Sequence, residues 1–267
     1  MRGFARRHPL GVFLAVTYTW SWSFWIADAI AGGHVSHFPG LLGPMVGALA
    51  TSGLTGTAGD LWRRMTRWRV PARWYGLAAI PLIPATVAYL VWWLLPIDGP
   101  SWSRIAHMPG APALGGIGTL VILLLVNGYG EETGWRGFAV PHLRERHGPL
   151  AASLLLAIPW ALWHLPTLWL DTGMRGFEPF MLPAFLLSLA AGSIVLTWLA
   201  EGSGSILIVA LWHTALNLGS ATDAAAGGVA VLTSVVVIVW AVRVIRGWRG
   251  NPRPAQPAMP LAAAHLR

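Results

Sequence analysis

Apolar runs of about twenty residues recur along most of the chain, and short polar stretches separate them. A helix needs roughly 20 mostly apolar residues to cross the hydrocarbon core of a bilayer. By this criterion the sequence predicts eight membrane-spanning helices, at about 10–31, 38–58, 74–96, 115–140, 149–170, 180–200, 204–221 and 225–245. The predicted fold is an all-α, polytopic membrane bundle.

The arginines test this count, because cytoplasmic loops carry an excess of basic residues. With the N-terminus inside, fifteen arginines fall on inner segments and only Arg104 and Arg175 fall on outer loops. This bias favours an even number of spans with both termini in the cytoplasm. We therefore expect residues 1–9 to be a cytoplasmic N-terminus, 10–246 a single transmembrane bundle, and 247–267 a disordered cytoplasmic tail rich in proline and alanine.

Composition agrees with a membrane protein: 55% of the residues are hydrophobic and 10% are charged, against about 25% charged in soluble domains. The net charge of +8 could suggest nucleic acid, but the arginines lie in short clusters between apolar runs, so we expect membrane lipids and no nucleic acid as partners. Cysteine is absent, which excludes disulfides and thiolate chemistry. We expect the plasma membrane of a bacterial-type cell.

The first apolar run has a second interpretation. Basic residues precede it and the small-residue sequence Ala27-Asp28-Ala29 follows it, which is also the pattern of a cleaved signal peptide. The run is longer than the usual apolar region of a signal peptide and is crowded with tryptophans. We therefore favour a retained span over 10–31.

Candidate chemistry is concentrated in the sequence from Gly130 to Gly137, which places two adjacent carboxylates and an arginine inside the fourth apolar run. Ionisable groups in a membrane segment are expensive and usually mark a functional site. Glu132 and Arg136 are four residues apart, so they share a helix face and can pair. Glu131 is rotated by about 100° from Glu132 and has no local cation, which suits a general base.

Two further apolar runs contribute one histidine each. His213 and Asn217 share a helix face and could aim two hydrogen-bond donors at one point, as an oxyanion hole requires. Trp160 stands four residues before His164 and would form an aromatic wall beside it. Taken singly, each histidine could be only a packing residue, and the Glu–Arg pair could be only a lock between helices. Their occurrence together favours a catalytic site.

In these motifs the chain resembles the type II CAAX prenyl endopeptidases, also called CPBP or ABI intramembrane proteases. The family pattern is Glu-Glu-x-x-x-Arg, then Phe-x-x-x-His, then His-x-x-x-Asn, and the resemblance covers about residues 115–220. The sequence has Trp160 where the family usually has phenylalanine, which leaves substrate fit more open than the chemistry.

The resemblance implies hydrolysis of a peptide bond near the C-terminus or the membrane-proximal part of a peptide or protein. Glu131 and His164 would activate a water, while His213 and Asn217 would stabilise the oxyanion. Glu132, Arg136 and Trp160 would support the site, which would open towards the cytoplasm.

A metal is a separate question. The family is often labelled as metalloproteases, and Glu131, His164 and His213 could supply a two-histidine, one-carboxylate zinc site. A metal-free mechanism also gives Asn217 a role, so we favour no required metal and keep zinc as the alternative.

Two other functions compete with the protease. Buried carboxylates and histidines could serve a proton- or ion-coupled transporter, and a non-catalytic protein of the bacteriocin-immunity type would need no chemistry. The sequence names neither the substrate nor the oligomeric state. One geometric condition does follow: for Glu131 to meet His164, either the fourth helix continues past Gly130 towards Leu143, or a bend at Pro159 brings His164 inward.

Overall fold

A computed structural model describes residues 2–32, 36–95, 101, 104, 107, 115–170, 178–222, 224–225 and 227–250. Its first half contains the helices α1 (Arg2–Arg7), α2 (Pro9–Ile30), α3 (Phe38–Leu41), α4 (Gly43–Thr55), α5 (Ala58–Met65), α6 (Arg73–Ala78), η1 (Ile80–Leu82) and α7 (Ile83–Leu94). The central path consists of α9 (Gly115–Ile122), η2 (Leu123–Tyr129), α10 (Gly130–Gly134), η3 (Trp135–Ala139) and α11 (Val140–Arg144). The remaining helices are α12 (Pro149–Trp163), η4 (Leu165–Trp169), η5 (Pro179–Met181), α13 (Leu182–Ser203), α14 (Ile206–Ser220) and α15 (Gly228–Gly250).

The prediction of an all-helical protein is confirmed, since the part of the chain that the structure describes contains helices and turns but no strand. Four helical segments are long and apolar enough to cross a membrane: Pro9–Ile30, Arg73–Leu94, Leu182–Ser203 and Gly228–Gly250. Two shorter apolar helices, α12 and α14, hold 15 residues each. The protein is therefore an integral membrane protein, with four of the eight predicted spans meeting the length criterion among the described residues.

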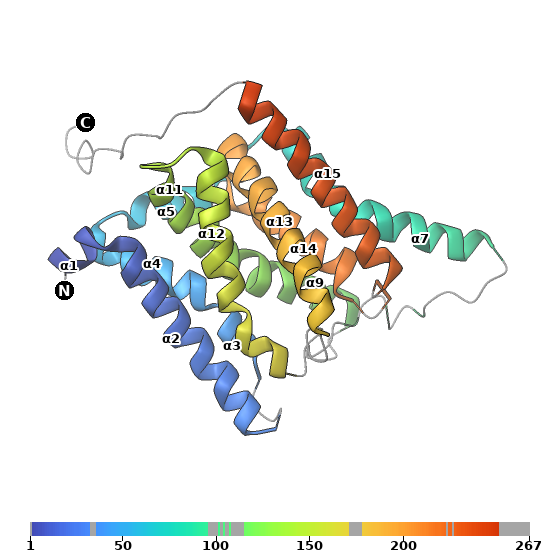
Figure 1. Cartoon of the computed structure of the whole chain (residues 1–267), viewed down its shortest axis with the longest axis horizontal. Helices are drawn as coiled ribbons and strands as arrows, with labels where there is room; N and C mark the ends of the chain where they lie inside the picture. The colour runs from blue at the N-terminus through green and yellow to red at the C-terminus, as the bar shows by residue number, and fades with distance from the viewer. Residues whose placement is uncertain are drawn as a thin grey trace.

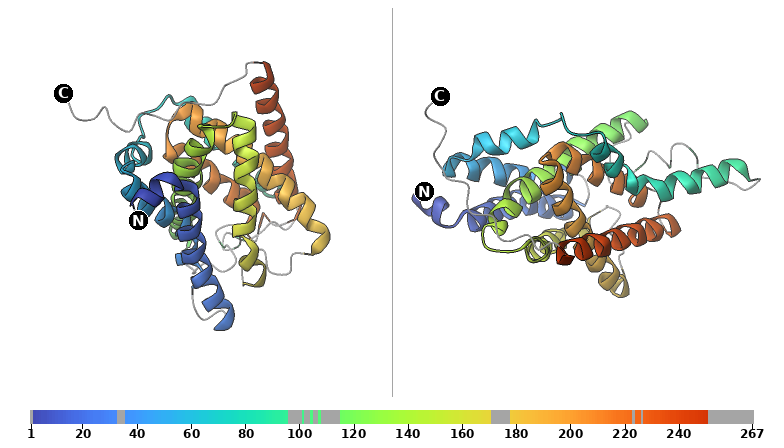
Figure 2. Two further views of the ribbon diagram at one scale, coloured as in Figure 1. Left: turned by 60° about the vertical axis from the view of Figure 1, so that its left-hand side comes forward. Right: turned by 90° about the horizontal axis from the view of Figure 1, so that it is seen from above.

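The helices surround the path that carries the two glutamates. Helices α2 and α4 pack against each other, and α4 packs on α10, while α14 lies along η2. Helices α12 and α13 form the next layer, and α15 packs outside α13 (Figure 1). The two further views show the same order, with α2 and α15 at opposite flanks of the bundle (Figure 2). The glutamates are thus enclosed by helices that are distant in sequence.

The site-bearing helix runs without a break from Gly115 to Arg144, which confirms the first of the two sequence-based conditions: the helix continues past Gly130. Two of its segments, η2 and η3, are π-helical and flank α10 on both sides. Such wide turns are rare and occur frequently at functional sites, because they change the direction in which the following side chains point. Here they set the orientation of the acidic pair in α10.

Glycines let the neighbouring backbones approach this helix closely. A Cβ on Gly134 would lie 2.4 Å from the carbonyl oxygen of Pro44 in α4, and a Cβ on Gly128 would lie 2.8 Å from that of Ala210 in α14. Both distances are shorter than side-chain atoms tolerate. Small residues at such contacts allow membrane helices to pack tightly, and here they bring α14 and its histidine within reach of α10.

Helix α2, whose retention or cleavage the sequence left open, packs into this fold. Phe13 and Trp25 are fully buried in the main core. The Tyr18 hydroxyl donates to the carbonyl of Pro159 at 2.6 Å, and the Trp22 indole donates to the carbonyl of Trp163 at 3.1 Å. These bonds reach two carbonyls of α12, so α2 contributes to holding the helix that ends at His164.

The structure corrects one local expectation. The predicted tail begins too early, because residues 247–250 continue α15 and Trp248 is buried against the core; residues 251–267 lie outside the described residues. Arg144 ends α11 and has an exposed fraction of only 1%. Its Nε donates to Oε1 of Glu201 in α13 at 2.5 Å. This ion pair joins the end of α11 to α13.

Candidate active site

Glu132 is the most completely enclosed acidic group of the site. Its side chain is fully buried, and its Oε1 accepts from Arg136 Nη1 at 3.1 Å, one helical turn away. The same oxygen lies 2.7 Å from His213 Nδ1 on α14. Because a carboxylate oxygen accepts, Nδ1 carries the hydrogen in this bond. Glu132 therefore fixes both an arginine on its own helix and the ring of a histidine from another.

Glu131 turns away from this pair. Its Oε2 accepts from the indole Nε1 of Trp160 at 2.9 Å, and its Oε1 faces His213 Nε2 at 3.9 Å. The second distance is too long for a hydrogen bond. Glu131 has an exposed fraction of only 2%, yet its Oε1 has no direct donor among the described residues. This oxygen is positioned to accept a proton.

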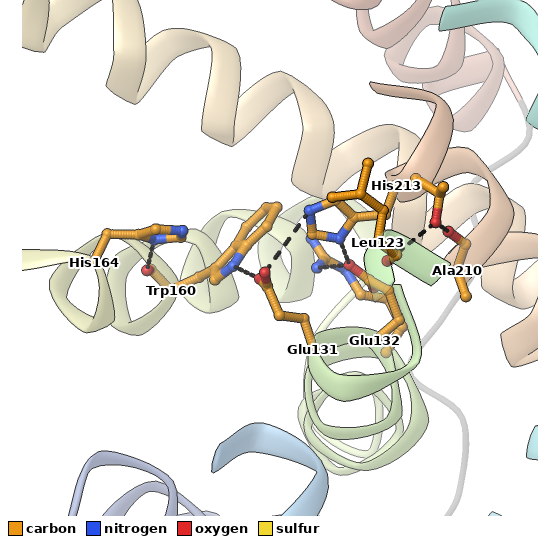
Figure 3. A network of polar contacts seen from close by, with 9 residues as sticks. Leu123, Glu131, Glu132, Trp160, His164, Ala210 and His213 are labelled. Carbon is orange, nitrogen blue, oxygen red and sulfur yellow. Dashed lines mark hydrogen bonds and ion pairs between the residues drawn. The ribbon is translucent and has the colours of Figure 1, made fainter. Parts of the chain in front are cut away.

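Trp160 lies between His164 and Glu131 (Figure 3) and contacts four ionisable residues of the site. Besides its bond to Glu131, its ring lies under the guanidinium of Arg136, with 4.2 Å from Cζ to the ring centroid. Its edge meets the ring of His213 at 5.9 Å and 80°. Its carbonyl oxygen lies 2.7 Å from Nδ1 of His164. The sequence predicted an aromatic wall at this position but not a hydrogen-bond donor to Glu131, which a phenylalanine could not provide.

His164 is linked less directly to the two glutamates than His213 is. It caps the C-terminal end of α12 and is half-buried, with ring contacts to Trp163 at 4.9 Å and Phe185 at 5.9 Å. A carbonyl oxygen only accepts, so Nδ1 donates to Trp160 and Nε2 is left with a lone pair in the neutral ring. Figure 3 shows Trp160 between His164 and Glu131, and no bond joins the two residues. The structure thus brings His164 beside the site without direct contact to the carboxylate.

Two asparagine side chains lie near the site, one of them one helical turn from His213 and the other one helical turn from Glu131. Asn217 follows His213 by one turn of α14, is half-buried, and its side chain makes no hydrogen bond to a described residue. Asn127, one turn before Glu131, has an exposed fraction of 7%, and its Oδ1 is buried without a partner. The sequence analysis missed Asn127, although a lone amide four residues before a buried glutamate in an apolar run was a usable signal.

Several polar atoms at this site are buried without a partner in the protein. They are Oε2 of Glu132 and both Nε and Nη2 of Arg136. A buried polar atom without a partner costs roughly 1–3 kcal/mol, so native proteins retain few of them. Their concentration here is what a site that receives a water or a substrate would show.

The three residues considered for zinc do not form a common ligand set. No group of three histidine, aspartate or glutamate side chains with metal-binding geometry occurs among the described residues. Glu131 and His213 face each other, whereas the Trp160 ring separates His164 from them. This arrangement does not fit the zinc site that the sequence left as an alternative.

Comparison with known proteins adds the family. Residues 113–219 match the family described as type II CAAX prenyl endopeptidase, Rce1-like. A protein named CAAX prenyl protease 2 from Methanococcus maripaludis is 27% identical over 170 residues, which are 61% of this chain and 62% of that protein. The matching part therefore spans less than two thirds of the relative's length. All labelled residues of the network in Figure 3 fall inside the matched segment, so the similarity to the Rce1-like type II CAAX prenyl endopeptidase family covers the candidate site.

Proposed function

We propose that this protein is a membrane-embedded endopeptidase that hydrolyses a peptide bond near the C-terminus or the membrane-proximal part of a peptide or protein. The family match and the name of the relative support protease chemistry. They do not favour the transporter or the non-catalytic alternative. We also propose that the site opens towards the cytoplasm, on the side where the arginine distribution places both termini.

One observation carries the proposal: two adjacent carboxylates in α10 have separate environments. Glu132 is committed to Arg136 and His213, while Glu131 keeps one oxygen free beside a histidine. A general base needs an accessible lone pair and a held side chain. Glu131 has the lone pair on Oε1, and the Trp160 indole holds the side chain in place through Oε2.

The proposed reaction uses these groups in order. Glu131 takes a proton from a water that attacks the scissile carbonyl carbon, and the Nε2 lone pair of His164 is a second acceptor for that water. The carbonyl oxygen, now an oxyanion, accepts from the Asn217 amide and from Nε2 of His213 in its protonated form. Collapse of the tetrahedral intermediate breaks the carbon–nitrogen bond, and the proton held by Glu131 passes to the leaving amine.

In this scheme His164 has to approach Glu131 when substrate binds, because Trp160 separates the two side chains. Catalytic hydrogen bonds that are long in the free enzyme commonly tighten in the substrate complex. The metal-free scheme is likewise a proposal, and it needs no ligand set from Glu131, His164 and His213.

The test uses purified protein in detergent with an internally quenched peptide that carries a membrane-adjacent sequence. We expect cleavage by the wild type and loss of cleavage in Glu131→Ala and His164→Ala, with both variants eluting as folded protein. Ion or proton flux in liposomes without peptide cleavage would contradict the proposal and support the transporter.

A further inference from the structure

A second feature lies away from the candidate active site, on the flank formed by α15. A groove with a volume of about 620 Å³ runs between α6, η1, α13 and α15. Its lining includes Val235, Val239, Trp198 and Trp240, and none of the residues of the candidate site. The volume lies within the range of about 300–1,000 Å³ that is typical of small-molecule sites.

The walls of this groove are mostly apolar and belong largely to helices that are able to cross a membrane. Three helical segments that bound it, Arg73–Leu94, α13 and α15, are among the four that are long and apolar enough to span a membrane. Val235 and Val239 are 49% and 46% exposed, so the groove opens outwards rather than into the core. Tryptophan rings on α13 and α15 form its floor, where Trp198 meets Trp240 edge to face at 6.0 Å. An occupant must therefore be largely apolar.

The lining of the groove contains one positively charged side chain. Arg243 is the only charged residue of the lining. It is exposed and makes no hydrogen bond or ion pair to a residue that the structure describes. Its neighbours on the last turns of α15 are Arg246 and Arg249, so the end of this helix is strongly basic. An apolar channel that leads to an unpaired arginine is complementary to an amphipathic anion.

We propose that this groove binds one anionic phospholipid, with an acyl chain along the valines of α15 and the phosphate on Arg243. An acyl chain gains little by leaving the bilayer for an apolar wall, because lipid tails are as apolar as the side chains. Selectivity must then come from the charge-assisted hydrogen bonds between guanidinium and phosphate. Basic pockets between helices bind lipid head groups for this reason.

The test is native mass spectrometry of purified protein after exchange into detergent with equal amounts of phosphatidylglycerol and phosphatidylcholine. We expect the wild type to retain phosphatidylglycerol in preference to phosphatidylcholine. Arg243→Ala should lower this retention about tenfold or more, as expected for losing a hydrogen bond between charged groups. Arg246→Ala is the matched control, because Arg246 is exposed on the same helix but does not line the groove, and it should retain the lipid.

A second pair of variants tests the acyl channel. Val239 lines the groove and Val242 does not, although they are similarly exposed at 46% and 41%. Val239→Trp should fill the channel and reduce retention, whereas Val242→Trp should leave it unchanged. Equal retention by Arg243→Ala and the wild type, or equal losses in Arg243→Ala and Arg246→Ala, would overturn the proposal. So would full retention by Val239→Trp in protein that elutes as the wild type does. None of these outcomes depends on peptidase activity.

Discussion

Two arginine–glutamate pairs lie inside the described part of the bundle, one with no exposed side-chain surface and one with 10% of the Glu201 side chain exposed, and they differ in how many of their polar atoms have partners. Arg136 and Glu132 lie 3.1 Å apart with no exposed side-chain surface, yet three of their polar atoms lack a partner in the protein. Arg144 and Glu201 lie 2.5 Å apart, and Arg144 also donates to the carbonyl of His147 at 2.5 Å. No atom of this second pair is among the unpartnered atoms of the described residues.

We interpret this difference in unpartnered polar atoms as a difference in role: Glu132 and Arg136 form a functional pair, and Arg144 and Glu201 form a structural one. Removing one partner of a buried ion pair leaves an uncompensated charge, so both pairs should matter for folding. The first pair also borders the second carboxylate, Glu131, and the imidazole of His213, and among the described residues it retains unused donors and acceptors. A pair that merely joins α11 to α13 has no reason to keep them, because each costs stability.

The sharpest test of this comparison is Glu131→Gln, which keeps the shape of the side chain and removes its basicity. General base catalysis contributes about 10²–10⁴-fold, so we expect kcat/KM for peptide cleavage to fall by about that factor. Glu201→Gln is the matched control in the second pair and should keep kcat in folded protein. Equal losses of kcat in Glu131→Gln and Glu201→Gln would contradict the distinction between a functional and a structural pair.

The second pair should show its effect in stability. Arg144→Met leaves Glu201, whose side chain is only 10% exposed, without its arginine, so we expect the free energy of unfolding to fall by up to about 3–5 kcal/mol. The measurement is unfolding in mixed micelles, with kcat measured on the protein that remains folded. The double variant Arg144→Met/Glu201→Leu should recover much of the loss, since an apolar pair can replace a buried ion pair. Loss of kcat at unchanged stability would contradict the structural role of this pair.

A smaller effect is expected at Trp160. Trp160→Phe keeps an aromatic ring beside Arg136 but removes the donor to Glu131, whose bond measures 2.9 Å. Loss of one hydrogen bond to a charged group is worth about 1.5–3 kcal/mol, so kcat should fall about tenfold while KM changes little. Trp163→Phe is the control, because it keeps an aromatic ring against His164 and removes only a donor whose bond, 2.8 Å to Ser21, lies outside the site. It should affect stability and leave kcat near the wild-type value.

The smallest effect is expected from metal removal. Because Glu131, His164 and His213 do not form a ligand set in this arrangement, dialysis against a chelator should leave kcat unchanged. The measurement combines peptide cleavage with elemental analysis of the purified protein. Stoichiometric zinc, together with activity that chelation removes and zinc restores, would show that the side chains regroup around a metal and that the proposed mechanism is wrong.

The sequence by itself determined the elements and the local pairing. The apolar runs predicted each main helical segment to within a few residues, because a membrane-spanning helix must satisfy its backbone internally and be apolar over a fixed length. The spacing of Glu132 and Arg136 predicted their bond, since residues four apart share a helix face. The same reasoning separated Glu131 from that pair.

Only the tertiary structure decided which partners meet across helices. Glu132 holds His213 because two glycines let α14 and α4 approach the central helix, and no local pattern encodes such an approach. The indole bond from Trp160 to Glu131, the separation of His164 by that same ring, and the pairing of Arg144 with Glu201 all join residues far apart in the chain. Periodicity fixes the face on which a side chain lies, but the packing of other helices fixes what that face meets.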